Sequence, residues 1–156
     1  MIFKYITFSI SIAFISWIVG MIVNAFLMKT IYYQKKLSNL NFIKSDKLNR
    51  VLGIDIFKWI VINTFFKFFN PKLKLNKRVN LVELNYLRNE MTNAEISHLI
   101  GFGFMIIFAA FGVINGKYLS ATTIMFVNIL MNLYPSLLQQ ENKRRIDRFI
   151  KINLAK

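Results

Sequence analysis

Two carboxylates and the only histidine of the chain lie at the entrance to an apolar stretch. Glu90, Glu95 and His98 lead directly into the run 99–113. Ionisable groups near a bilayer core are energetically costly, so they are functional candidates by default. Glu95 and His98 are three residues apart and are therefore neighbours on a helix. A carboxylate beside an imidazole fixes the tautomer of the ring, which suits a general base. The alternative is a histidine at the headgroup boundary with solvated glutamates.

A second group of polar residues follows the next apolar segment. Asn128, Asn132 and Gln139 recur at helical spacing and form one polar stripe. One interpretation is interhelical hydrogen bonding that holds a helix bundle together. Gln139 lies closer to the water boundary, with Asn142 and Arg145 after it, where bundle packing explains a polar side chain less well.

The arginines at this boundary also allow two interpretations. Arg144 and Arg145 can simply hold the cytoplasmic side of the membrane, as basic residues next to a span often do. They can instead form a phosphate or carboxylate clamp, because the planar guanidinium binds such groups through two parallel hydrogen bonds.

The composition indicates a small integral membrane protein that forms one domain, residues 1–156. The chain is 55% hydrophobic, has no cysteine and carries a formal charge of +14. The lack of cysteine excludes disulfides, a thiol nucleophile and thiolate metal sites. The positive charge fits cytoplasmic loops that face anionic lipid, and no RNA-binding signature supports a nucleic-acid partner.

The elements that must position these residues are membrane helices. Apolar runs predict three spans at about 5–28, 98–115 and 119–138, each close to the roughly 20 residues that cross a bilayer. Asn115-Gly116-Lys117 predicts a tight turn between the second and third spans, and Pro135 is expected to loosen the third.

Two further helices are expected at the membrane surface. Ile54–Phe69 is only 16 residues long and is interrupted by Asp55, Lys58 and Lys67, so we expect an interfacial or re-entrant amphipathic helix. The basic segment 143–156 predicts a carboxyl-terminal helix. The expected fold class is therefore an all-α integral membrane protein with three transmembrane helices and these two elements.

The distribution of charge predicts the topology. Residues 29–58 hold seven Lys and Arg, 67–88 hold six and 143–156 hold six, against one (Lys4) before the first span and one (Lys117) between the other two. The positive-inside rule places the basic segments in the cytoplasm, with the amino terminus outside. The second span then begins, and the third ends, at the cytoplasmic surface, so the two polar clusters are predicted to meet there.

Several other chemistries lack their motifs. The chain has no Gly-x-Ser-x-Gly, phosphate-binding loop or dinucleotide fingerprint. A di-iron bundle needs Glu-x-x-His twice, and this chain has one histidine. We therefore expect no metal and no cofactor.

The two polar clusters together resemble a known family. Glu90-x-x-x-x-Glu95-x-x-His98, a span, then Asn132-Leu-Tyr134-Pro-x-x-x-Gln139-x-x-Asn142-x-x-Arg145 is similar to the glycosyl-4,4'-diaponeurosporenoate acyltransferase family of small bacterial membrane proteins. The resemblance covers about 81–148, and Lys58-Trp59 is loosely similar to a Lys-Trp patch of the family. Where the family's second motif usually reads Gln-Arg-Tyr-Asn, this chain has Gln139-Gln140-Glu141-Asn142.

The resemblance implies an acyltransferase at the cytoplasmic leaflet of the bacterial cell membrane. A fatty acyl chain would move from acyl-CoA or a similar donor to a hydroxyl of a lipid or glycolipid acceptor, such as a glycosylated carotenoid. The implied catalytic residues are His98 as base, Glu95 and Glu90. The implied substrate-binding residues are Asn132, Tyr134, Gln139, Asn142, Arg144, Arg145 and Trp59, with Gln139 and Asn142 as oxyanion donors and the arginines as donor-phosphate ligands.

Two other functions remain open from the sequence. One is a non-enzymatic accessory protein whose basic face binds anionic lipid or a partner. The other is a small carrier or channel, which three spans could form only as an oligomer and which the polar stripe alone supports.

Overall fold

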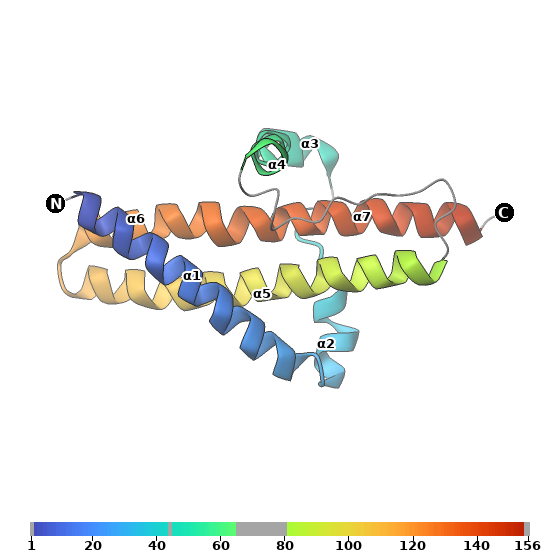
Figure 1. Cartoon of the computed structure of the whole chain (residues 1–156), viewed down its shortest axis with the longest axis horizontal. Coiled ribbons are helices and arrows are strands. Elements are labelled where there is room, and N and C mark those ends of the chain that lie inside the picture. The colour runs from blue at the N-terminus through green and yellow to red at the C-terminus, as the bar shows by residue number, and fades with distance from the viewer. Residues whose placement is uncertain (1, 44, 65–80, 155–156) are drawn as a thin grey trace. The chain divides into compact units, whose positions relative to one another are not determined.

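The fold is all-α, as the sequence predicts. The computed structural model describes residues 2–43, 45–64 and 81–154, and these residues contain no strand. The helices are α1 (Ile2–Leu27), α2 (Ile31–Lys35), η1 (Leu37–Asn39), α3 (Asp46–Val51), α4 (Ile54–Asn63), α5 (Leu81–Ile114), α6 (Tyr118–Asn128), the π-helical turn η3 (Ile129–Leu133) and α7 (Tyr134–Leu154). Figure 1 shows their order along the chain.

Three helical stretches in the described residues are long and apolar enough to cross a membrane. They are Ile2–Leu27, Leu81–Ile114 and Tyr118–Ile152, which confirms the predicted three-span membrane fold. The second and third exceed the predicted spans. At 1.5 Å per residue, 34 residues measure about 51 Å, whereas the hydrocarbon core is about 30 Å thick. A large part of each must therefore lie outside the hydrocarbon.

The two further segments that were expected to be helical are helical in the described residues, and their position at the membrane surface stays a prediction. α4 begins after Gly53, whose φ of 71° is left-handed, and ends at Asn63. The remainder of the predicted interfacial helix, residues 65–69, lies outside the described residues. The basic carboxyl-terminal segment is helical as predicted, but it continues α7 without a break instead of forming a separate element.

The chain folds into two compact units. We call residues Met1–Leu40 with Asn93–Ser136 the apolar unit, and residues Asn41–Thr92 with Leu137–Lys156 the charged unit. The apolar unit contains one acidic residue, Glu95, and the other six acidic residues belong to the charged unit. α5 contributes its first part to the charged unit and the remainder to the apolar unit.

Small residues let the helices of the apolar unit approach closely. The buried face of α1 includes Ser9, Ala13, Ser16 and Gly20, each about one turn after the last, while large apolar side chains such as Phe26 lie on the exposed faces. The core of the unit joins α1, α5 and α6 through Ile12, Ala13, Met105, Ala109, Ile124 and Val127. Figure 1 shows α1, in blue, crossing this part of α5 and α6.

The connection between α5 and α6 is the predicted tight turn. Gly116 has a left-handed φ of 68°, and the N–H of Lys117 donates to the carbonyl of Gly112 at 2.8 Å. The third span is irregular immediately before Pro135. There the N–H of Tyr134 donates to Ile129 O, five residues earlier, in the π-helical pattern. The expected loosening of the third span at Pro135 is thus a π-helical turn.

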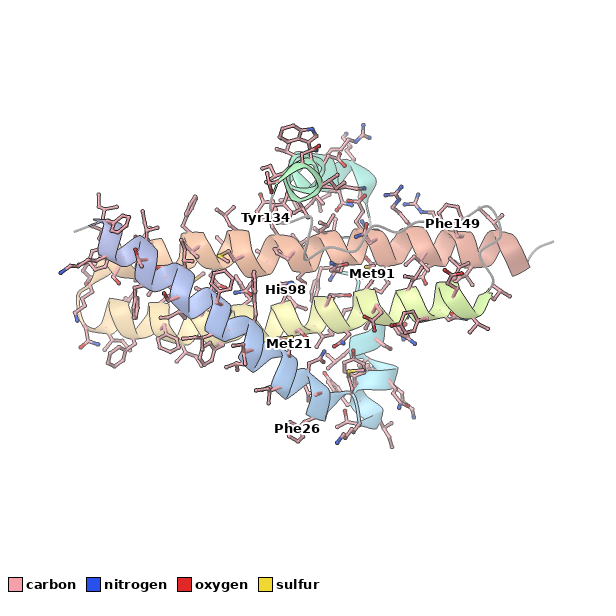
Figure 2. All side chains as sticks on the ribbon, viewed as in Figure 1. Met21, Phe26, Met91, His98, Tyr134 and Phe149 are labelled. Carbon is pink, nitrogen blue, oxygen red and sulfur yellow. The ribbon has the colours of Figure 1, made fainter. Side chains whose placement is uncertain are left out.

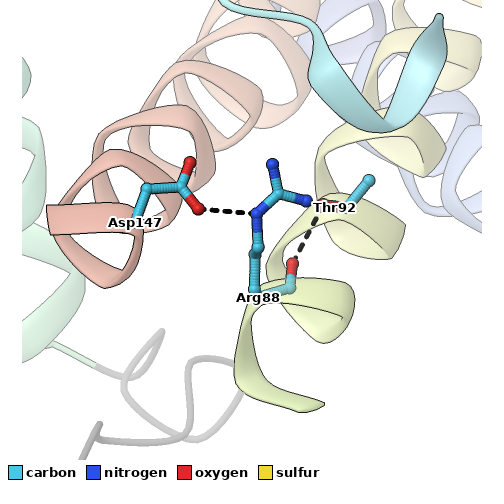
Figure 3. A network of polar contacts seen from close by, with 3 residues as sticks. All are labelled: Arg88, Thr92 and Asp147. Atoms are coloured by element: carbon cyan, nitrogen blue, oxygen red, sulfur yellow. Dashed lines mark hydrogen bonds and ion pairs between the residues drawn. The ribbon is translucent and has the colours of Figure 1, made fainter. Parts of the chain in front are cut away.

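In the charged unit, α5 packs against α7. Leu84 and Met91 of α5 contact Ile146 of α7 in a buried cluster. Beside it, Arg88 Nε donates to Asp147 Oδ1 at 2.6 Å, and the hydroxyl of Thr92 donates to the carbonyl of Arg88 (Figure 3). Because the ion pair is partly exposed, we expect it to add little to stability and to act mainly by aligning α5 with α7.

The close approach of α1 to α5 generates the first prediction. A Cβ added to Gly20 would collide with the carbonyl oxygen of Ser97, which is backbone and cannot move aside cheaply, whereas a Cβ on Gly103 meets nothing within 4 Å. We expect Gly20→Ala to lower the free energy of unfolding by about 1–3 kcal/mol. Thermal unfolding in detergent micelles measures this loss.

Gly103→Ala is the matched control for this substitution. It adds the same methyl group to a membrane helix of the same unit and should leave the unfolding temperature unchanged or slightly higher, because Ala favours helix over Gly. Equal unfolding temperatures for the two variants would show that α1 does not pack on α5 in this way.

Candidate functional site

A buried carboxylate lies in the apolar unit. The side chain of Glu95 has no exposed surface. Asn24 of α1 hydrogen-bonds to the turn of α5 that carries Glu95. The Nδ2 of Asn24 lies 3.0 Å from Asn93 O, 2.6 Å from Asn93 Oδ1 and 3.1 Å from Ser97 Oγ. These acceptors flank Glu95 on both sides in the sequence. The helical turn that carries the carboxylate is therefore held by contacts between α1 and α5.

Tyr33 of α2 belongs with Glu95 and Asn24 to a group of side chains that we call the buried polar cluster. Its other members are Trp17, His98, Asn128 and Asn132. The side chain of Tyr33 is 7% exposed and lies near that of Asn24. Burial raises the pKa of the Tyr33 phenol above its ordinary value, the negative charge of Glu95 raises the pKa further, and the polar side chain of Asn24 acts in the opposite direction. The phenol is thus kept protonated, in the form that can donate a hydrogen bond.

His98 lies one turn further along α5. Its imidazole meets the indole of Trp17 edge to face, with ring centroids 5.9 Å apart and an interplanar angle of 88°, and it interacts with the side chain of Asn132. Its Nδ1 is buried and has no hydrogen-bond partner among the described residues. Figure 2 labels His98 among the side chains of this region. A buried ring nitrogen that bonds to none of the described residues is available to take up or release a proton.

The asparagine stripe of the third span hydrogen-bonds across helices. Asn128 Nδ2 donates to Phe102 O at 3.0 Å, and Asn132 Nδ2 lies 3.1 Å from Ser16 Oγ and 2.9 Å from Asn128 Oδ1. Both side chains are fully buried. The interpretation of the stripe as bundle hydrogen bonding is confirmed for these two residues. The Oδ1 of Asn132 has no partner among the described residues.

In the charged unit, α7 holds the segment that precedes α3. Gln140 Oε1 accepts from Phe42 N at 3.0 Å, and Arg144 Nη1 donates to Asn41 Oδ1 at 3.0 Å and to Ile43 O. The Nε and Nη2 of Arg144 are buried without a partner among the described residues. These two atoms form one edge of the guanidinium, which can bind a carboxylate or phosphate through two hydrogen bonds.

The two residues that depart from the family's second motif both contact the amino-terminal part of the charged unit. Gln140 holds Phe42, as described above, and Glu141 Oε1 pairs with Lys58 Nζ of α4 at 3.3 Å. Lys58 thus has an intramolecular partner, whereas Trp59 beside it is 65% exposed. The departures are therefore part of the packing of this unit.

The predicted site residues divide between the two units. The apolar unit holds Glu95, His98, Asn132 and Tyr134, and the charged unit holds Glu90, Gln139, Asn142, Arg144, Arg145 and Trp59. Within the apolar unit, the structure brings His98 and Asn132 together. The predicted meeting of the two polar clusters at one membrane surface stays a prediction, as does the catalytic pairing of Glu95 with His98.

The predicted residues of the charged unit differ in exposure. Glu90 and Arg145 are exposed, and Asn142 is 8% exposed. The Oε1 of Gln139 is buried without a partner among the described residues. A cavity of about 240 Å³ lies along one face of α7, lined by Arg145, Arg148, Phe149 and Ile152. Within the described parts of the chain, no three His, Asp or Glu side chains gather as a metal site would require.

Three residues of the polar cluster were missed by the sequence analysis, namely Trp17, Asn24 and Tyr33. Asn24 left a signal, since it interrupts an apolar span. Tyr33 and Trp17 left none, because an aromatic residue in or beside an apolar span is ordinary. Their contacts depend on how α1 and α2 pack.

Together, the fold and the buried polar cluster define an all-α membrane protein with titratable groups inside its helix bundle. The family model for glycosyl-4,4'-diaponeurosporenoate acyltransferase matches residues 29–152. The chain belongs to this family, and the match is broader than the region of resemblance seen in the sequence. No curated protein and no solved structure matches the chain significantly. Membership supports an acyltransferase role in carotenoid glycolipid modification.

The environment of Tyr33 generates a prediction about pH. Because its folded-state pKa is raised, the phenol contributes stability that is fully present below the pKa of the unfolded chain, near 10, and lost as the pH rises through the folded pKa. We expect Tyr33→Phe to flatten the fall in unfolding temperature at high pH. Spectroscopic titration of the tyrosines should also lose its latest-ionising component.

Tyr32→Phe is the matched control. Tyr32 is the preceding residue and is 62% exposed, so removing its hydroxyl should leave the high-pH fall in unfolding temperature intact. If both variants lose the same titration component, Tyr33 is not buried beside Glu95 as described.

Proposed function

We propose that this protein transfers a fatty acyl chain to a hydroxyl of a glycosylated carotenoid or a similar glycolipid, at the cytoplasmic leaflet. The observation that carries the proposal is the buried Nδ1 of His98, which has no hydrogen-bond partner among the described residues and lies within the region that matches an acyltransferase family. His98 is the only imidazole of the chain, and an imidazole is the side chain best suited to exchange a proton near neutral pH.

In the proposed reaction, His98 accepts the proton of the acceptor hydroxyl. The hydroxyl oxygen attacks the carbonyl carbon of an acyl thioester, an ester C–O bond forms and the C–S bond breaks. The proton held by His98 then passes to the departing thiolate. Each step is ordinary general acid–base catalysis and needs no metal ion or redox cofactor.

Glu95 is proposed to stabilise the positive charge that develops on His98. It is the only carboxylate of the apolar unit and is completely buried, so its field acts through a medium of low dielectric. Asn24 fixes the helical turn that carries it, and the protonated Tyr33 offers a nearby donor. Glu90, which is exposed, is proposed to act at the edge of the site.

The charged unit is proposed to bind the acyl donor. The buried Nε and Nη2 edge of Arg144 lacks a partner among the described residues and suits a donor phosphate. Arg145 and Arg148 add positive charge beside a cavity that also has apolar walls, Phe149 and Ile152. A donor such as acyl-CoA has negatively charged phosphates that suit the arginines and an apolar acyl chain that suits the apolar walls.

The remaining predicted residues receive roles by the same proposal. Gln139 and Asn142 would donate hydrogen bonds to the oxyanion that forms on the thioester carbonyl. Asn132, Tyr134 and Trp59 would contact the acceptor. The positive-inside distribution of Lys and Arg supports a cytoplasmic site, with the amino terminus outside and the carboxyl terminus in the cytoplasm.

The first test is lipid mass spectrometry on cells that carry the intact gene, a deletion or the His98→Ala allele. We expect one acylated lipid to be lost in both the deletion and the His98→Ala strain, with its deacylated precursor accumulating, because the base is missing in both. An unchanged lipid profile in all three strains would refute the acyltransferase proposal and favour the accessory-protein function. For this comparison, the intact protein and the His98→Ala variant must be present in the membrane at similar levels.

The second test separates the two predicted glutamates. We expect Glu95→Gln to lower kcat by about 10²-fold, as loss of a positioned acid–base partner typically does, while Glu90→Gln changes kcat much less because its side chain is exposed. Both substitutions remove one negative charge from the same helix, so each controls for the other. Equal kcat values for the two variants would remove Glu95 from the proposed mechanism.

A further inference from the structure

Trp17 connects the irregular part of the third span to the imidazole of His98. Pro135 has no backbone N–H, so the carbonyl of Met131, four residues earlier, lacks the donor that a regular α-helix would supply. The indole Nε1 of Trp17 donates to this carbonyl at 3.0 Å. Because lipid offers no alternative donor, this bond anchors the indole strongly.

The anchored indole is also held from the side. Phe14 packs on it edge to face, with centroids 5.0 Å apart and an interplanar angle of 75°. The imidazole of His98 meets the same indole at 5.9 Å and 88°. One ring thus has a hydrogen bond to η3, a packing contact within α1 and a contact with the histidine of α5.

The orientation of His98 needs such a contact. Its Nδ1 has no hydrogen-bond partner among the described residues, so nothing polar holds that side of the ring. Among the described residues, packing against the indole and the interaction with Asn132 are two contacts that can define the ring plane. Asn132 is itself fixed by its bonds to Ser16 and Asn128.

We infer that Trp17 is a positioning residue for His98: it holds the imidazole in one orientation and is itself held by the carbonyl of Met131, to which Pro135 cannot donate. The catalytic consequence rests on the proposed function, whereas the effect on the ring does not. Trp17 lies in α1, outside the matched residues 29–152, so the family match assigns it no role.

The test uses the full chain in detergent micelles. Because the chain has one histidine, isotopic labelling of histidine gives a single imidazole in NMR relaxation measurements. Trp17→Phe keeps a ring but loses the Nε1–H, and Trp17→Leu loses both. Phe8→Leu is the control, since Phe8 is an exposed aromatic residue of the same helix.

We expect both Trp17 variants to increase the mobility of the imidazole, Trp17→Leu more than Trp17→Phe, and Phe8→Leu to leave it unchanged. In the acyl-transfer assay, Trp17→Phe should lower kcat by about tenfold or more with little change in KM, because a misplaced base slows chemistry without weakening binding. Trp17→Phe retains most of the indole volume, so it remains informative if Trp17→Leu does not fold.

Different outcomes separate this inference from the proposed function. An imidazole as rigid in Trp17→Phe as in the unaltered protein, together with an unchanged kcat, would overturn the positioning role while leaving the role of His98 intact. Full acyl-transfer activity in His98→Ala would refute the role of His98 as the base, and no acyl transfer by the unaltered protein would refute the proposed function. The relaxation data would then still decide whether Trp17 orders the ring.

Discussion

The requirement that polar groups inside an apolar bundle bond to one another governs this structure. Lipid offers neither donors nor acceptors, so each polar side chain on a membrane helix needs a partner within the protein. Asn24 meets this need by bonding to α5, Asn132 by bonding to α1, and Asn128 by bonding to a carbonyl of α5. These directional bonds set the register of the three helices, which apolar packing alone would leave poorly defined.

Small residues make these bonds possible. A Cβ at Gly101 would lie 2.9 Å from Asn132 Oδ1 and 3.1 Å from the carbonyl of Ser16, so glycine is needed where α1, α5 and η3 converge. With the backbones this close, a short side chain such as Asn reaches a neighbouring helix. The same closeness leaves Glu95 without exposed surface and brings Trp17 against His98. The polar bonds and the close packing of the backbones thus depend on each other.

In the charged unit, the two residues that depart from the family's usual second motif make contacts within the unit. Where the family usually has Arg and Tyr, this chain has Gln140 and Glu141. Gln140 accepts from the backbone of Phe42, and Glu141 pairs with Lys58. Arg144 also binds the segment before α3 through one nitrogen, which leaves the opposite edge of the guanidinium without a partner among the described residues. The anchoring of this segment therefore occupies only one part of the guanidinium.

Much of this protein could be predicted from the sequence because the signals are local. Long apolar runs predict membrane helices wherever they occur, so the three spans, the turn at Gly116 and the irregularity before Pro135 followed from residue order. Polar residues inside apolar runs, such as His98 and Asn132, were visible for the same reason. The spacing of the two polar clusters was also enough to indicate the family.

Tertiary structure decided which of these residues meet. Tyr33 lies 62 positions before Glu95 in the printed sequence, and only the packing of α1 and α2 brings its phenol into the field of that carboxylate. The bond from the Trp17 indole to the carbonyl of Met131 joins residues more than 110 positions apart. It is made to a carbonyl to which Pro135, having no backbone N–H, cannot donate. No local pattern encodes such pairs, because an aromatic residue in an apolar span looks the same whether it faces lipid or a histidine.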